Sequence, residues 1–186
     1  MLIEQTRHFN HRSELLDVWM PILIQYIDQF HNYSANYHRG LKGGIDQVLR
    51  ILTGSHASFV SLELLNQLRD AQNKSNPFEL IWEDRHKMSI QTDKGLITPV
   101  WEHTIPINEL RNIILELRTF EKVYETLTNY PGIAWITQEE DNRLVMMKLH
   151  KARPNGFLPS YQIAGINLLN KEEYESRIKN ICILSC

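Results

Sequence analysis

The residues best suited to chemistry lie in a glycine-rich basic stretch, His38-Arg39-Gly40-Leu41-Lys42-Gly43-Gly44. An apolar helical pattern begins directly after it, at Ile45. Glycines let the backbone turn tightly, and the first N–H groups of a helix attract anions together with the helix dipole. The stretch therefore predicts an anion-binding loop, or alternatively a plain turn between two helices. The residues predicted to contact the anion are Arg39, Lys42, Gly43 and Gly44.

Aromatic residues accompany these cations. No acidic residue lies between Asp28 and Asp46, whereas Tyr33 and Tyr37 do. Rings stack on nucleic-acid bases while cations meet phosphates. The composition of this first basic window therefore favours nucleic acid or a nucleotide as the anion.

A second basic window runs from 142 to 170 without an Asp or Glu, in a chain that has 22 acidic residues among 186. It carries cations on a predicted strand and aromatic residues in the loop that follows. Either the window binds an anionic partner, or its cations are only solvated on an ordinary strand and loop. The residues predicted to contact nucleic acid or phosphate are Lys148, His150, Lys151, Arg153 and Tyr161.

A third basic face depends on a predicted hairpin. If Thr92 lies opposite Leu96, then Arg85 faces His103 and Lys87 faces Trp101. Trp101 would then be a stacking platform for bases, or alternatively a cation–π partner on a solvated or oligomer-facing sheet.

The sequence lacks the motifs of several common enzyme classes. The chain has no Gly-x-x-x-x-Gly-Lys-Ser/Thr, Gly-x-Gly-x-x-Gly or Gly-x-Ser-x-Gly motif, and no lysine follows a carboxylate by two positions. His8 and His11, and separately the acidic run 139–141, are possible metal ligands, but neither pattern supplies a full ligand set. The least implausible acid–base group is Glu83, Asp84 and His86. We therefore predict no catalytic residues, no metal and no cofactor, and lean away from an enzyme.

Composition is that of an ordinary globular chain. It is 42% hydrophobic and 23% charged, with a net charge of −2, so any attraction for nucleic acid must come from a local patch. Cys182 and Cys186 do not form a disulfide framework, and the N-terminal residues lack a signal-peptide pattern. The longest apolar region, 18–27, is too short to cross a bilayer. These features predict a cytoplasmic protein without a membrane partner.

Periodicity predicts a mainly helical part over 1–75. Helices are expected from Ser13 with a kink at Pro21, over 44–53 and over 58–71, with a connection over 31–40. The polar segment 73–77 is the expected boundary within a single domain, 1–186.

From 77 to 186 the period favours an antiparallel sheet of hairpins with a long packed helix. Strands are expected over 78–83, 86–92 and 96–105, with a turn at 93–95, and then a helix over 108–127. A second hairpin is expected over 133–137 and 143–151, then a helix over 171–179 and a strand over 181–184. The predicted fold class is α+β.

Two stretches carry a resemblance that covers the full chain. They are Ile22-Leu23-Ile24-Gln25-Tyr26-Ile27-Asp28-Gln29-Phe30 and Trp101-Glu102-His103-Thr104-Ile105-Pro106-Ile107. The chain resembles an uncharacterised orphan protein of a Mu-like prophage region in a small-genome proteobacterium. That resemblance implies a bacterial cytoplasmic setting and a bias toward nucleic-acid handling, and it implies no reaction.

Two functions are therefore expected. The first is non-catalytic binding of nucleic acid or nucleotides through the local basic patches. The alternative is a protein-interaction or assembly module without a nucleic-acid role, expected as a homodimer or higher homo-oligomer. This alternative rests on the many large apolar residues of the predicted helices, including Trp19, Phe30 and Phe59, in a chain of nearly zero net charge.

Overall fold

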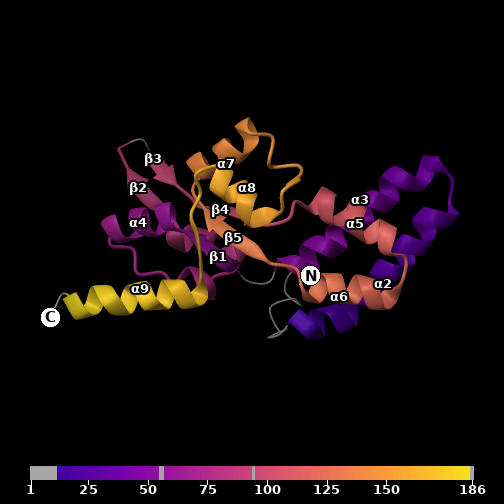
Figure 1. Cartoon of the computed structure of the whole chain (residues 1–186), viewed down its shortest axis with the longest axis horizontal. Helices are drawn as coiled ribbons and strands as arrows, with labels where there is room; N and C mark the ends of the chain where they lie inside the picture. The colour runs from indigo at the N-terminus through magenta and orange to yellow at the C-terminus, as the bar shows by residue number, and fades with distance from the viewer. Residues whose placement is uncertain (1–11, 55–56, 94, 185–186) are drawn as a thin grey trace. The chain divides into compact units, whose positions relative to one another are not determined.

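The computed structural model describes residues 12–54, 57–93 and 95–184, and for 12 and 178–184 it describes the backbone only (Figure 1). The chain divides into two compact units. Unit 1 comprises 1–55 and 105–131, and unit 2 comprises 56–104 and 132–186. The polar segment 73–77 lies inside unit 2 and not at a boundary between the units.

Unit 1 is helical in its described residues. Its helices are α2 (Arg12–Asn32), α3 (Ala35–Thr53), α5 (Ile107–Leu117) and α6 (Phe120–Thr128). On α3 the buried side chains recur at three- and four-residue spacing at Ile45, Val48, Leu49 and Leu52. This apolar stripe packs with those of α2, α5 and α6 in one buried cluster, which explains why the helices associate.

Unit 2 contains a four-stranded mixed sheet in the order β4-β5-β1-β6. Its strands are β1 (Ala57–Ser61), β4 (Val100–His103), β5 (Ile133–Ile136) and β6 (Leu168–Asn170). β1 and β5 are parallel, while β4–β5 and β1–β6 are antiparallel. Every residue of β5 is buried, as expected of an interior strand covered on both faces.

Helical segments and a small hairpin cover this sheet. One face carries Val60 and Trp135 and packs with Leu64 of α4 (Leu62–Asp70) and Met88 of η2 (Trp82–Met88). The other face carries Ala134 and Ile136 and packs under α7 (Gln138–Met146) and α8 (Phe157–Ile163). The remaining elements are η1 (Pro77–Glu79), the paired strands β2 (Ile90–Thr92) and β3 (Gly95–Ile97), and α9 (Lys171–Leu184).

The predicted α+β class is confirmed, because helices precede a sheet with further helices packed on it. The sheet, however, is mixed rather than built of antiparallel hairpins. The predicted turn at 93–95 does join β2 to β3, but Thr92 pairs with Gly95 instead of Leu96. β4 pairs with β5 and not with 85–92, so the predicted pairs Arg85–His103 and Lys87–Trp101 are wrong.

The connection predicted over 31–40 is also wrong. α2 continues through Pro21 to Asn32, only Tyr33 and Ser34 separate it from α3, and the glycine-rich stretch lies inside α3. A helical glycine costs only about 1 kcal/mol relative to alanine. Burial of the apolar stripe of α3 outweighs that cost.

Other predicted elements end differently because of local caps. The helix predicted over 108–127 breaks at Arg118, which has a left-handed backbone (φ 56°), and Thr119 caps α6. The helix predicted over 58–71 begins as β1, and Ser61 then caps α4. Pro77 and the Asn76 cap start a short 3-10 helix where a strand was expected. The strand predicted over 181–184 is the end of α9.

The hairpin predicted over 133–151 is wrong because 138–146 is the helix α7. Thr137 accepts from the backbone N–H of Glu140, and Glu140 accepts from the backbone N–H of Thr137 at 2.8 Å, which is a capping box. Ser61 donates to the same carboxylate at 2.5 Å. Glu140 therefore joins the N-termini of α4 and α7 inside unit 2.

We predict opposite effects for alanine at two neighbouring glycines of α3. A Cβ at Gly43 meets no atom within 4 Å, whereas a Cβ at Gly44 would lie 2.5 Å from Cε1 of the Tyr26 ring on α2. Gly43→Ala should therefore stabilise the protein by roughly 0.5–1 kcal/mol through helix propensity. The Gly44→Ala protein should be at least about 1 kcal/mol less stable than the Gly43→Ala protein, because Tyr26 must move. Urea unfolding followed by tryptophan fluorescence measures both, and equal stabilities would contradict the close approach.

We predict that Glu140→Gln changes the pH dependence of stability. Burial raises the pKa of the Glu140 carboxyl, and its hydrogen bonds to Ser61 and Thr137 oppose this. A raised folded-state pKa contributes stability at low pH that is lost as pH rises through it. The free energy of unfolding of the variant, measured relative to wild type, should therefore increase as the pH is raised from about 4.5 toward neutral. A constant difference over this range would show that the carboxyl titrates normally.

Candidate functional site

The turn between α2 and α3 gathers aromatic and basic side chains. Tyr33 and Tyr37 are both exposed and form an edge-to-face pair, with ring centroids 5.8 Å apart. His38 stacks on Phe30 at 4.1 Å, and the Lys42 ammonium lies 5.5 Å from the Phe30 centroid. We call this group, together with the exposed Arg39, the α2–α3 turn surface.

Hydrogen bonds from two histidines fix this turn. His38 Nε2 donates to the Tyr33 carbonyl at 3.2 Å, and His31 Nε2 donates to the Leu115 carbonyl at 2.9 Å. A carbonyl only accepts, so the Nε2 atom of each ring carries a proton. The second bond satisfies an orphan carbonyl at the end of α5 and attaches the end of α2 to it.

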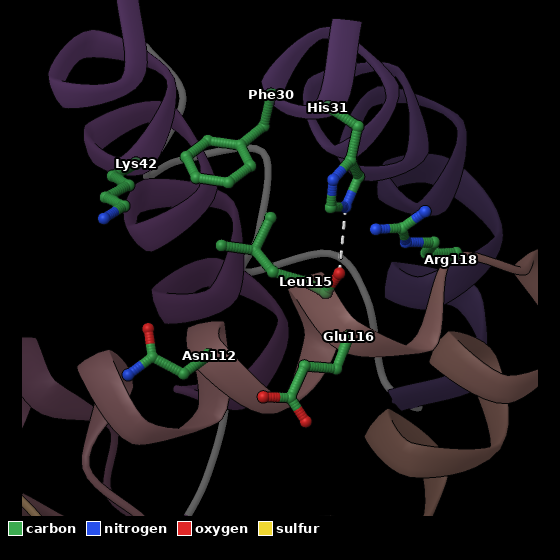
Figure 2. A pocket seen from close by; sticks show the side chains of 7 residues that line it. All are labelled: Phe30, His31, Lys42, Asn112, Leu115, Glu116 and Arg118. Atoms are coloured by element: carbon green, nitrogen blue, oxygen red, sulfur yellow. Dashed lines mark hydrogen bonds between the residues drawn. The ribbon is translucent and has the colours of Figure 1, made fainter. Parts of the chain in front are cut away.

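A cavity of about 490 Å³ adjoins the turn surface. Figure 2 shows side chains of α2 and α3 on one side of it and those of α5 on the other. The pocket is lined by Phe30, His31, Lys42, Asn112, Leu115, Glu116 and Arg118. The pocket is shallow and open to solvent.

An ion pair positions the walls of this pocket. Arg111 Nη1 donates to both carboxylate oxygens of Asp46, at 2.9 and 2.7 Å. Asp46 lies one helical turn after Lys42 on α3, and Arg111 precedes Asn112 on α5. The pair therefore sets the distance between the two helices at the level of the pocket.

The pocket combines cations with side chains that can form hydrogen bonds. Lys42 and Arg118 supply positive charge. Asn112 and Glu116 lie one turn apart on α5 and offer an amide and a carboxylate. A carboxylate repels phosphate but accepts from the N–H groups of a base. The pocket therefore suits a ligand with an anionic part and a polar planar part.

The glycines contribute differently from what the sequence predicts. Gly43 and Gly44 lie inside α3, where helical hydrogen bonds occupy the backbone N–H groups. The anion-attracting N-terminus is instead at Ala35, after Ser34, whose side chain makes no capping hydrogen bond. Arg39 and Lys42 lie on the N-terminal turns of α3 and not in the loop that the sequence predicts.

The second basic window maps to α7, α8 and the segment between them in unit 2. Lys148 and Lys151 are exposed, and His150 is half-buried. Lys148 has a left-handed backbone (φ 60°). It follows α7 in a Schellman arrangement, in which Lys148 N donates to the Val145 carbonyl and Leu149 N to the Leu144 carbonyl.

Arg153 and Tyr161 are buried, which makes them internal groups. Arg153 Nη2 donates to Glu102 Oε1 at 2.6 Å, and Nη1 donates to the carbonyls of His103, at 2.6 Å, and Thr104. The guanidinium carbon lies 4.6 Å from the Tyr161 ring centroid. Burial raises the pKa of the Glu102 carboxyl, and the Arg153 charge opposes the rise. This guanidinium is committed to β4 rather than presented to a phosphate.

Other residues considered from the sequence are engaged elsewhere or lie outside the described ranges. Trp101 packs edge-to-face on Trp135 at 4.5 Å, inside unit 2. His86 contacts the Glu83 carbonyl, and Asp84 pairs with Lys87 at 2.9 Å. Positions 1–11, 185 and 186 are not described, nor is the side chain of Cys182.

Within the described residues, no group of three or more His, Cys, Asp or Glu side chains is arranged to hold a metal ion. No described helix has both the length and the apolar character needed to cross a membrane. The two basic windows belong to different units, so each is considered by itself.

Sequence reasoning did not find the α5 wall of the pocket. Asn112, Glu116 and Arg118 lie about 80 residues after the turn, in a segment that the periodicity describes only as a packed helix. The break at Arg118 carries no Gly or Pro signal.

Comparison of the chain with protein-family models, with curated proteins and with solved structures gives no match in any of the three searches.

We predict that the Arg153–Glu102 pair is required for the stability of unit 2. Arg153→Met should cost about 3–5 kcal/mol, because it leaves the Glu102 carboxylate buried without its countercharge. The double variant Glu102→Gln/Arg153→Met should recover part of that loss, since no charge is then left alone. Chemical unfolding of the wild type, both single variants and the double variant measures the coupling, and additive losses would contradict it.

Proposed function

We propose that the protein binds single-stranded nucleic acid, or a nucleotide, through the α2–α3 turn surface and the adjoining pocket of unit 1. The observation that carries this proposal is the joint exposure of Tyr33, Tyr37 and Arg39 at one turn. Exposed rings with no acidic residue between 29 and 45 are suited to stacking with bases and pairing with phosphates.

The expected role of each side chain follows from its chemistry. Phosphates meet Arg39, Lys42 and Arg118, and the N-terminal turn of α3 adds the positive end of its dipole. Bases stack on the exposed tyrosine rings, whereas Phe30 is already engaged by His38. Asn112 and Glu116 are available for the polar edge of one base in the pocket. None of these contacts requires a chemical reaction.

We predict that Arg39→Gln/Lys42→Gln weakens binding of a labelled oligothymidine of about 20 nucleotides and reduces its salt dependence. Each phosphate contact on a single strand contributes about 0.7 to the slope of log K against log salt, so losing two should lower the slope by about 1.4. Fluorescence anisotropy between about 50 and 200 mM salt measures both quantities. Tyr33→Ala/Tyr37→Ala should weaken binding without changing the slope, because stacking is not ionic.

Matched controls carry the same kinds of change at other exposed positions. Arg69→Gln/Lys74→Gln removes two exposed charges from unit 2, and Phe120→Ala removes an exposed ring from α6. Both should bind the oligonucleotide like wild type. The proposal fails if wild type does not bind at about 50 mM salt, or if the controls lose as much as the turn variants.

A further inference from the structure

Five large apolar side chains on and directly after two helices of unit 2 are exposed. We call them the α7–α8 surface, and their exposed fractions are Met146 74%, Ile163 57%, Met147 48%, Leu158 47% and Val145 46%. The buried residues of the same helices, Leu144 and Tyr161, pack with Ala164 toward the sheet. The exposed side chains therefore lie on the solvent side of this helical layer.

A hydrogen bond brings the C-terminal ends of α7 and α8 together. Arg143 Nε donates to the Ala164 carbonyl at 3.0 Å. Met147 lies one turn after Arg143, and Ile163 immediately precedes Ala164. The two helices lie side by side in Figure 1. Met146, Met147 and Ile163 therefore lie near the junction of the two helices.

The charge beside this surface is positive. Lys148 follows Met147 directly, Lys151 is exposed on the same segment, and no Asp or Glu occurs from 142 to 170. The acidic residues of α7 lie in its first turn, and Glu63 of α4 pairs with Arg143 at 3.1 Å, so Lys148 beside Met147 supplies the exposed positive charge of this surface. Lys148 also occupies a left-handed position that favours glycine, so a lysine there has a conformational cost.

These features favour one kind of occupant. A second copy presenting the same face would bring lysines against lysines, and Coulomb repulsion opposes that pairing. Nucleic acid needs rings to stack on, but Phe157 packs on Phe59 at 5.6 Å and Tyr161 is buried. Flexible thioether and aliphatic side chains next to cations instead fit an apolar helix face with acidic edges.

We propose that the α7–α8 surface docks an amphipathic helix of a partner protein. Its apolar face covers Met146, Met147 and Ile163, and an acidic residue at its edge pairs with Lys148. The proposal concerns unit 2 alone and does not depend on nucleic-acid binding by unit 1. The helix apolar stripe repeats at i, i+3, i+4 and i+7.

The test uses a labelled synthetic helix with leucines at that spacing and glutamates at the remaining positions, and a second peptide with lysines in place of the glutamates. Fluorescence anisotropy should show binding of the glutamate peptide and not of the lysine peptide. Met146→Ser/Ile163→Ser should weaken binding about tenfold, and Lys148→Gln/Lys151→Gln should weaken it most at low salt. All four side chains are exposed, and urea unfolding of each variant checks that wild-type stability is retained.

Two controls separate this surface from other features. Leu96→Ser changes another exposed apolar residue, 65% exposed on β3, and should leave peptide binding unchanged. Arg39→Gln/Lys42→Gln should also bind the peptide like wild type, because those residues belong to unit 1.

Four results would overturn the proposal. If the two peptides bind equally, the charge of the partner does not matter. If Leu96→Ser loses as much peptide binding as Met146→Ser/Ile163→Ser, the peptide does not bind specifically at the α7–α8 surface. Self-association that is abolished by Met146→Ser/Ile163→Ser in sedimentation experiments would identify a second copy as the occupant. Loss of oligothymidine binding in Lys148→Gln/Lys151→Gln, with no peptide binding, would identify nucleic acid instead.

Discussion

The close approach of α3 to α2 at Gly44 is the constraint on which the arrangement of unit 1 depends. A side chain at this position would overlap the Tyr26 ring, so only glycine lets the two helices meet at this distance. The contact lies about two and a half turns after the start of α3 and therefore determines how the α2–α3 turn is oriented. It brings Phe30 of α2 next to His38 and Lys42 of α3. A glycine that does not touch any ligand thus shapes the surface proposed to bind one.

In unit 2 the corresponding constraint is electrostatic. Two carboxylates, Glu102 and Glu140, are withdrawn from solvent, and burial raises the pKa of each. Each is retained by specific donors: Arg153 for the first, and Ser61 with the backbone of Thr137 for the second. Buried ion pairs contribute little net stability, but the loss of one partner is costly. They therefore determine which segments pack together more than how strongly they pack.

The fold class and the helical character of most of unit 1 follow from the sequence because long apolar stripes at helical spacing survive in any tertiary context. The elements of unit 2 were harder to predict, since their identity depends on caps. Thr137 and Glu140 form a capping-box signature that is visible in the sequence and that identifies α7. The break at Arg118 was not predictable, because the apolar spacing continues through it and neither Gly nor Pro marks it. The pairing of β5 with β1 joins residues about 75 positions apart, which periodicity cannot reveal.

The two windows without acidic residues show what a count of charges along the sequence can predict and what it misses. In the first, Arg39 remains exposed near two exposed tyrosines, as the count suggests. In the second, Arg153 pairs with Glu102, an acidic residue 51 positions earlier that lies outside the window. A local count of acidic residues cannot detect a distant carboxylate that folding brings to the same guanidinium. Lys148 and Lys151 stay exposed, and they do so beside methionines rather than rings. The same sequence pattern therefore leads to two surfaces of different composition, one with tyrosines next to cations and the other with methionines next to lysines.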